Sequence, residues 1–205
     1  MDYAPILKKN LLRTPNLPDY DKATREFRWE AAKKEIAYFE DGTLNIAHHV
    51  LDKHRGTTAE HKTAVIYDGD HGQKVLTFAD FIASTNRFAN VLKKLGVNKG
   101  DRIFIFLPRV PELSISFLGT LKTGAIAGNL FSAFGYEALR DRLLDSGASV
   151  LVTNHELLDR VRTIKKDLPD LKWILVVDGN DGQEREFSYE ELMSQSSEHF
   201  EVEHT

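Results

Sequence analysis

The chain has 205 residues, of which 41% are hydrophobic and 28% are charged, enough for the core of one domain or slightly more. Its formal net charge of −4 provides no basic surface for nucleic acid, and its apolar runs are far shorter than the ~20 residues that cross a bilayer. The absence of cysteine excludes disulfides, thiolate nucleophiles and cysteine metal sites. The N-terminus lacks a signal-peptide pattern. We therefore expect a cytoplasmic protein that neither spans a membrane nor binds nucleic acid.

The N-terminal part of the chain is predicted to be irregular and then helical. Residues 1–22 include Pro5, Pro15 and Pro18 and are predicted to form an irregular arm. Between residues 22 and 39 the apolar side chains recur at helical spacing, which predicts one helix ending before a break at Asp41. A second short helix is predicted around residues 46–51.

Two β-rich runs follow, at residues 63–67 and 74–78, and the turn residues between them indicate a hairpin. Thr77 and Asp80 then match a capping box, which predicts that a helix begins there. Its apolar stripe continues to Leu95, and Gly96 occupies the position of a glycine that ends a helix.

From residue 102 onward, apolar strands alternate with helices. We predict strands at residues 102–107, 125–130, 149–153 and 173–178, helices at 111–122, 136–145 and 155–166, and a last helix capped by Ser188 and Glu191. The continuous apolar character of the strands is typical of a parallel sheet covered on both faces. The predicted class is therefore α/β, with a mixed, largely parallel sheet flanked by helices and a helical and hairpin N-terminal part.

No motif for phosphate binding is present: neither GxxxxGK[ST] nor GxGxxG occurs. The eight histidines show no metal-binding spacing, and the short carboxylate pairs lie in glycine-rich turns that favour aspartate by themselves.

Two segments are candidates for ligand binding. The first follows a predicted strand, where ligands bind in open parallel sheets. There, Phe131 and Phe134 offer a stacking face beside the small residues Ser132 and Ala133; the alternative is that both rings cover the next helix. The second segment is a basic helix whose cations suit a phosphate or form a solvated face: Arg160, Arg162, Lys165 and Lys166.

Several collinear segments resemble the N-terminal region of acetyl-CoA synthetases, which are acyl-activating, adenylate-forming enzymes. The first is the segment with the letters YFEDGTLNIA, at residues 38–47, and it is the order and spacing of all the segments together that make chance unlikely. The others are residues 51–54, 87–92, 96–101, 107–112, 124–128, 141–146 and 151–153. The resemblance extends from about residue 20 to 178 and covers about the first third of such enzymes.

The resemblance implies the chemistry. Members join a carboxylate to ATP, with Mg²⁺, and then transfer the acyl group to coenzyme A. Residues 23–205 then form the N-terminal portion of the adenylate-forming domain, without its ATP loop, acyl pocket and C-terminal domain. We therefore expect this chain alone to be inactive, to bind no cofactor tightly and to self-associate through a truncated face.

The resemblance also assigns coenzyme A contacts. Phe131 matches a phenylalanine at the adenine, Ser132 and Ala133 replace a glycine pair, and Arg162 matches an arginine near the 3′-phosphate. Asp159 stands where many members have a second arginine, and Arg160 is a candidate substitute for it.

Acetate is the expected acyl substrate. The open alternatives are a fragment of a medium-chain acyl-CoA synthetase, a non-catalytic module that binds coenzyme A or a protein, and a generic α/β nucleotide binder.

Overall fold

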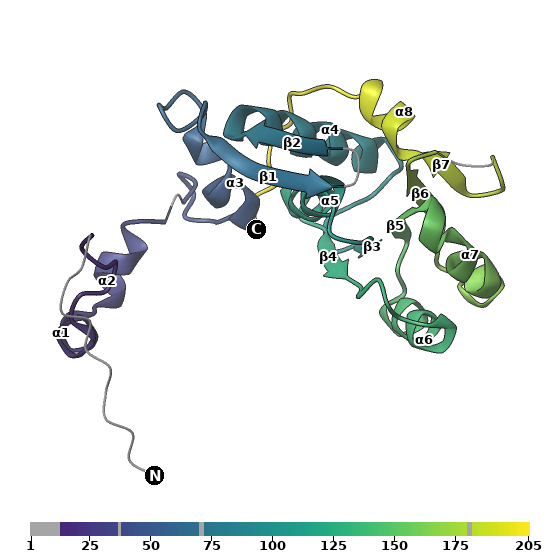
Figure 1. Cartoon of the computed structure of the whole chain (residues 1–205), viewed down its shortest axis with the longest axis horizontal. Coiled ribbons are helices and arrows are strands. Elements are labelled where there is room, and N and C mark those ends of the chain that lie inside the picture. The colour runs from purple at the N-terminus through teal and green to yellow at the C-terminus, as the bar shows by residue number, and fades with distance from the viewer. Residues whose placement is uncertain (1–12, 37, 70–71, 180–181) are drawn as a thin grey trace, which may run out of the picture. The chain divides into compact units, whose positions relative to one another are not determined.

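The computed structural model describes residues 13–36, 38–69, 72–179 and 182–205 (Figure 1). Contacts divide the chain into two units, Met1–Ile36 and Ala37–Thr205, each of which is described by itself. Most of the predicted arm, together with Asp70, His71 and Asp181, lies outside the described residues.

The first unit contains two short helices, α1 (Tyr20–Glu26) and α2 (Trp29–Lys33). Asp19 caps α1 by accepting a hydrogen bond from the Lys22 backbone N–H, and the extended backbone of Phe27 ends this helix. The prediction of one helix over residues 22–39 is therefore wrong. Neither helix buries a residue among those described, so no core holds the two halves of the pattern in one straight helix.

The second unit follows the predicted order of elements. Its first half comprises α3 (Ile46–Val50), the 3₁₀ turn η1 (Asp52–His54), β1 (Thr63–Gly69), β2 (Gly72–Thr77) and α4 (Phe78–Lys94). Its second half comprises β3 (Arg102–Phe106), α5 (Pro111–Lys122), β4 (Ile126–Asn129), α6 (Tyr136–Ser146), β5 (Val150–Asn154), α7 (His155–Ile164), η2 (Lys165–Asp167), β6 (Trp173–Val177), β7 (Glu186–Ser188) and α8 (Tyr189–Ser194).

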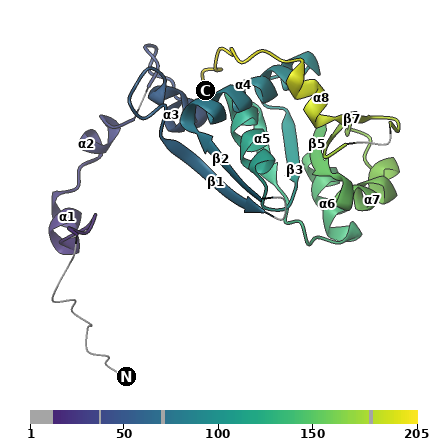
Figure 2. The same ribbon diagram turned by 45° about the horizontal axis from the view of Figure 1, so that its top comes forward.

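The sheets confirm the predicted α/β class, with one refinement. Within the described residues, the main sheet has five strands in the order β4-β3-β5-β6-β7, and its neighbouring pairs are parallel. The antiparallel hairpin of β1 and β2 forms a sheet of its own beside it (Figure 2). The main sheet is thus parallel rather than mixed.

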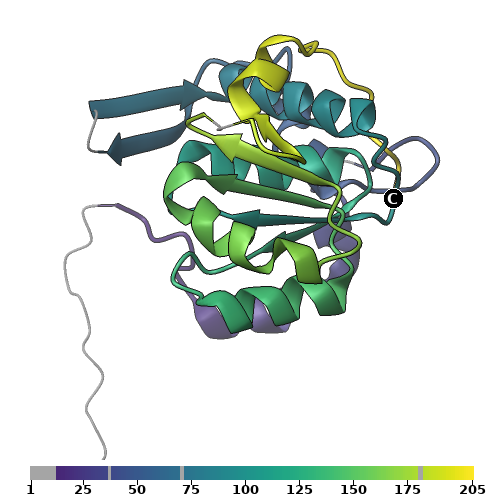
Figure 3. The ribbon, with the colours of Figure 1, turned by 90° about the vertical axis from the view of Figure 1, so that its right-hand side faces the viewer.

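Helices cover both faces of the parallel sheet (Figure 3). The cluster on the side of α4, α5 and α8 takes alternate residues of each central strand, such as Val150 and Val152 of β5. Leu151, between them, points to the opposite cluster with α6 and α7. Because successive side chains alternate across a strand, a strand buried on both faces must be apolar throughout, as the sequence predicted.

The predicted ends of α4 are confirmed. Thr77 and Asp80 form a complete capping box, and Gly96, with a φ of 80°, follows the helix in the left-handed conformation that favours glycine. The strand β7, which has three residues and pairs with β6, was not predicted from the sequence.

The end of the described chain packs against the beginning of the second unit. Leu44 and Thr205 exchange two backbone hydrogen bonds, and the Glu203 backbone N–H donates to the Lys122 carbonyl oxygen. Asn45 links both segments, because its side-chain amide donates to the carbonyl oxygens of Leu121 and Glu203. These bonds place residues 199–205 beside residues 39–55.

Candidate functional site

The loop between β4 and α6 lies beyond the carboxyl end of β4, as predicted. The Leu130 N–H still donates to the Ile105 carbonyl oxygen, so the loop leaves the sheet after residue 130. A tight turn follows, in which the Phe134 N–H donates to the Phe131 carbonyl oxygen at 2.9 Å. The backbone therefore returns on itself directly at the candidate stacking residue.

The two phenylalanines of this loop have different environments. The Phe131 side chain is 66% exposed, whereas Phe134 packs against the core cluster on the side of α6 and α7. The guanidinium of Arg142 lies 4.3 Å from the centre of the Phe134 ring, within the range of a cation–π contact. Phe131 meets Phe134 edge-on, with 5.9 Å between ring centres. Phe134 therefore covers the neighbouring helix, while Phe131 keeps a ring face open.

Arg160 of α7 contacts this same loop. Its Nη1 donates to the carbonyl oxygens of Ser132 at 2.7 Å and of Phe134 at 3.2 Å. The structure thus brings together four of the five predicted site residues: Phe131, Ser132, Ala133 and Arg160.

Two hollows flank the loop. One, of 210 Å³, is lined by Pro108, Ser132, Ala133, Glu156, Leu157 and Arg160. The other, of 240 Å³, is lined by Leu107, Pro108, Arg109, Leu113, Asn129, Leu130, Phe131 and Ser132. Both share Pro108 and Ser132, so space for a ligand is present on each side of the loop. Ser132 is half-buried and Ala133 is exposed, so neither small residue closes the approach to the loop backbone.

Arg162, the fifth predicted residue, faces another part of the molecule. Residues two positions apart on a helix project about 200° from each other. Arg162 accordingly points to β7, where its Nε and Nη2 contact the two carboxylate oxygens of Glu186 at 3.1 and 2.7 Å. A hollow of 320 Å³ on this side is lined by Arg162, Lys165, Lys166, Leu168, Pro169, Glu184 and Arg185.

The surroundings of Arg162 are rich in carboxylates. Glu186 is completely buried at its side chain, and Lys165 lies 3.8 Å from it. Asp159, one turn before Arg162, is 88% exposed at its side chain and lies 3.6 Å from the guanidinium. The sequence could not reveal the partner Glu186, which lies 24 residues further along the chain.

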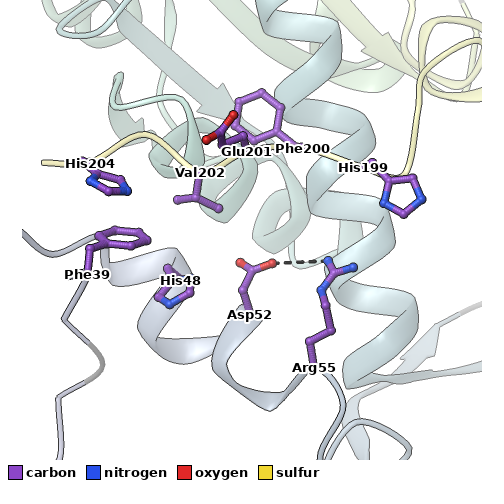
Figure 4. Close-up of a pocket in the computed structure, with 9 residues that line it drawn as sticks. All are labelled: Phe39, His48, Asp52, Arg55, His199, Phe200, Glu201, Val202 and His204. Atoms are coloured by element: carbon purple, nitrogen blue, oxygen red, sulfur yellow. Dashed lines mark ion pairs between the residues drawn. The ribbon is translucent and has the colours of Figure 1, made fainter. Parts of the chain in front are cut away.

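A larger hollow, which no local pattern of the sequence predicts, lies between residues 39–55 and 199–204 (Figure 4). Its volume is 550 Å³, and it is lined by Phe39, His48, Asp52, Arg55, His199, Phe200, Glu201, Val202 and His204. The rings of Phe39 and His204 stack with centres 3.8 Å apart, and His204 Nδ1 lies 2.7 Å from Asp41 Oδ2. Hydrogen bonds from Thr43 and from His204 hold the pKa of Asp41 well below its usual range.

Asp52, which lines this hollow, is already engaged in ion pairs. Asp52 contacts the Lys122 ammonium through both carboxylate oxygens, at 2.9 and 2.8 Å, and Arg55 lies 3.6 Å away. Lys122 is completely buried, and its ammonium also donates to Asn86 Oδ1 at 2.6 Å. Burial lowers the pKa of Lys122, and Asp52 opposes that shift. We assign this network to stability.

In the part of the chain that the structure describes, no three histidine, aspartate or glutamate side chains form a group that would hold a metal ion. Among the same residues, no helix is both long and apolar enough to span a bilayer.

Comparison with known proteins identifies the class to which this chain belongs. The family described as AMP-binding enzyme matches residues 52–204, so the chain belongs to that family. Over 190 residues it is 40% identical to the acetyl-coenzyme A synthetase of Bacillus subtilis, covering 92% of this chain and 33% of that protein. It is 44% identical over 117 residues to the acetyl-coenzyme A synthetase of Campylobacter jejuni, covering 57% of this chain and 18% of that protein.

Solved structures agree with this assignment. A Brucella canis acyl-CoA synthetase superposes with a TM-score of 0.79 at 28% identity, covering 91% of this chain and 34% of that one. The anthranilate CoA ligase AuaEII, solved with anthranoyl-AMP, superposes with a TM-score of 0.72 at 26% identity, covering 80% and 30% of the two chains. The chain thus spans between 18% and 34% of the length of these relatives and has the fold of the N-terminal domain of adenylate-forming enzymes.

Proposed function

We propose that the chain is the N-terminal portion of an acetate–CoA ligase that acts through acetyl-adenylate. The observation that carries the proposal is the 40% identity to an acetyl-coenzyme A synthetase over 92% of the chain. In the proposed reaction a carboxylate oxygen of acetate attacks the α-phosphorus of ATP and releases pyrophosphate. The coenzyme A thiol then attacks the acyl carbon and releases AMP. The proposed setting is the cytoplasm, with ATP, Mg²⁺ and coenzyme A as cosubstrates and cofactors.

Within this chain, we assign coenzyme A recognition to the loop that follows β4. Phe131 has an exposed ring, and an exposed aromatic face suits stacking on an adenine. Ser132 and Ala133 border space on the same loop, so the residues present fit the adenine end of coenzyme A. Arg162 is the proposed contact for the 3′-phosphate, and its bond to Glu186 orients the guanidinium while offsetting part of its charge.

The proposed 3′-phosphate contact is expected to be weak. A single exposed ion pair contributes about 0–1 kcal/mol, and Asp159 adds a carboxylate 3.6 Å from the guanidinium. The expected affinity of the 205-residue chain for coenzyme A is accordingly millimolar at best, which corresponds to about 4 kcal/mol.

The proposal is tested with the protein expressed from its complete reading frame. We expect it to form acetyl-CoA from acetate, ATP, Mg²⁺ and coenzyme A, and to catalyse acetate-dependent exchange of pyrophosphate into ATP. A preference for longer acids would identify a medium-chain acyl-CoA synthetase, and failure of both assays with every acid would overturn the proposed function.

The role of Phe131 is tested in the same protein. Phe131→Ala is expected to raise KM for coenzyme A about tenfold, because the stacking of one base on the aromatic ring is lost. Acetate-dependent pyrophosphate exchange should stay unchanged. Tyr38→Ala is the matched control, because Tyr38 is an aromatic residue that is 43% exposed and is not among the residues lining the two hollows beside the loop. An unchanged KM in Phe131→Ala would remove the adenine assignment.

A further inference from the structure

Arg160 holds the loop after β4 at two points. The same nitrogen, Nη1, donates to the carbonyl oxygens of Ser132 at 2.7 Å and of Phe134 at 3.2 Å. These two carbonyl groups flank Ala133 at the tip of the loop. Because both acceptors belong to the backbone, the contact restrains the path of the chain and not merely one side chain.

The backbone that Arg160 restrains carries the exposed aromatic ring. Phe131 and Phe134 are joined by the hydrogen bond from the Phe134 N–H to the Phe131 carbonyl oxygen. Arg142 contacts the Phe134 ring from α6, so the far side of the turn is held by a second cation. The Phe131 ring, by contrast, is 66% exposed and meets the Phe134 ring edge-on. Its direction therefore depends on the turn that Arg160 and Arg142 restrain.

The geometry does not favour Arg160 as a phosphate ligand. Its Nη1 already has two acceptors, and Glu156, one helical turn earlier, lines the same hollow with a negative charge. Arg162 lies on the opposite flank of α7 and lines a different hollow. A phosphate bound by both arginines would have to bridge two sides of the helix.

We infer that Arg160 is a positioning residue for coenzyme A recognition: it fixes the turn at residues 131–134 so that Phe131 presents its ring to the adenine. The inference rests on the proposed function, and it differs from the sequence-based expectation that Arg160 replaces the missing arginine at position 159. The two roles predict different responses to loss of the guanidinium, since only a phosphate ligand distinguishes coenzyme A from its 3′-dephospho form.

The first measurement needs no ligand. In the 205-residue chain, Arg160→Met keeps an unbranched side chain but removes the donors. We expect the Phe134 amide, which donates to the Phe131 carbonyl oxygen, to exchange hydrogen for deuterium about tenfold faster in this variant, because the turn opens locally. Arg160→Lys, which restores a cationic donor, is expected to return much of the protection. Lys172→Ala removes one exposed positive charge at the amino end of β6 and should leave the loop unchanged.

The second measurement compares binding of coenzyme A and 3′-dephospho-coenzyme A by Arg160→Met and by the wild-type chain. We expect Arg160→Met to bind both ligands about tenfold more weakly than the wild-type chain does, with the ratio of the two dissociation constants unchanged. The reason is that the variant loses the orientation of the aromatic ring and not a phosphate contact. Arg160→Lys should recover both affinities.

Two results would overturn the inference: unchanged amide exchange in Arg160→Met, or selective loss of coenzyme A binding with dephospho-coenzyme A unaffected. If the wild-type protein binds neither ligand, even with its complete reading frame expressed, the proposed function fails. The exchange measurement then still decides whether Arg160 orders the loop.

Discussion

Arg162 and Glu186 form a bidentate ion pair in which the carboxylate is completely buried and the guanidinium side chain is 20% exposed. The pair joins α7 to β7, the edge strand of the parallel sheet. A phosphate that contacts Arg162 must therefore share the guanidinium with a carboxylate that has no access to water.

Replacing only one member of this pair should destabilise the fold more than replacing both. Glu186→Leu leaves the guanidinium without its buried partner, and we expect the free energy of unfolding to fall by about 3 kcal/mol. Arg162→Leu leaves the buried Glu186 carboxylate without its bidentate partner and should also be destabilising. The double variant Arg162→Leu with Glu186→Leu should lose less than the two single variants together, because both charges of the pair are removed. Urea denaturation followed by circular dichroism measures all three variants, and a double variant as unstable as the sum of the two single variants would contradict the interpretation.

Reversing the charge at Asp159 should strengthen coenzyme A binding selectively. Asp159→Arg removes the carboxylate 3.6 Å from Arg162 and adds an exposed cation on the same face of α7. We expect coenzyme A to bind up to about fivefold more tightly and 3′-dephospho-coenzyme A to bind as before, as for one exposed ion pair. Isothermal titration of both ligands checks this.

The matched control for this charge reversal is Asp145→Arg on α6, an equal change at an exposed position. A similar gain with Asp145→Arg, or with the dephospho ligand, would show a general charge effect instead of a local phosphate contact.

The buried ammonium of Lys122 should make stability rise with pH on the alkaline side. Its pKa is lowered from 10.5 by burial, so the unfolded chain binds the proton more strongly between the lowered pKa and 10.5. Stability linked to this group therefore increases as pH rises through that window. In Lys122→Met with Asp52→Asn, which removes both charges of the pair, this increase should disappear.

The pH comparison is best made below pH 10.0, the ordinary pKa of tyrosine, because burial raises the pKa of Tyr189 and gives the opposite sign above it. Thermal denaturation of the wild-type chain and of the Lys122→Met, Asp52→Asn variant between about pH 7 and pH 10 provides the measurement. Parallel stability curves for the two proteins would show that Lys122 does not titrate differently on folding.

The expected self-association of the chain through a truncated face remains a prediction, and we propose the hairpin of β1 and β2 as the surface involved. Ile66 and Val75 are partners in the register of the hairpin, and their side chains are 64% and 51% exposed. In the described residues β1 and β2 pair only with each other, so their outer edges accept another strand. We expect sedimentation velocity to show dimers of the 205-residue chain, and Ile66→Thr with Val75→Thr to reduce them; monomers at high concentration would contradict this.

The sequence by itself determined most elements of the second unit, because their signals are local. The Thr77–Asp80 capping box, Gly96 after α4 and the apolar strands each act within a few residues. Helix and strand periodicities then place the β4–α6 loop beyond the end of a strand. The same local reasoning failed for residues 22–39, where helical spacing occurs without a buried face to hold one continuous helix.

The tertiary structure alone decided how the candidate site residues divide around α7. In the sequence, Arg160 and Arg162 are two cations of one basic helix with no local difference between them. In the structure, Arg160 binds the carbonyl oxygens of Ser132 and Phe134, whereas Arg162 binds Glu186. Likewise, the pairing of Leu44 with Thr205 joins segments 161 residues apart. Such contacts depend on the packing of α7 against β7 and of the C-terminal segment against α3. No local preference of the chain specifies these contacts, since they form only when elements that are distant in the sequence pack into one core.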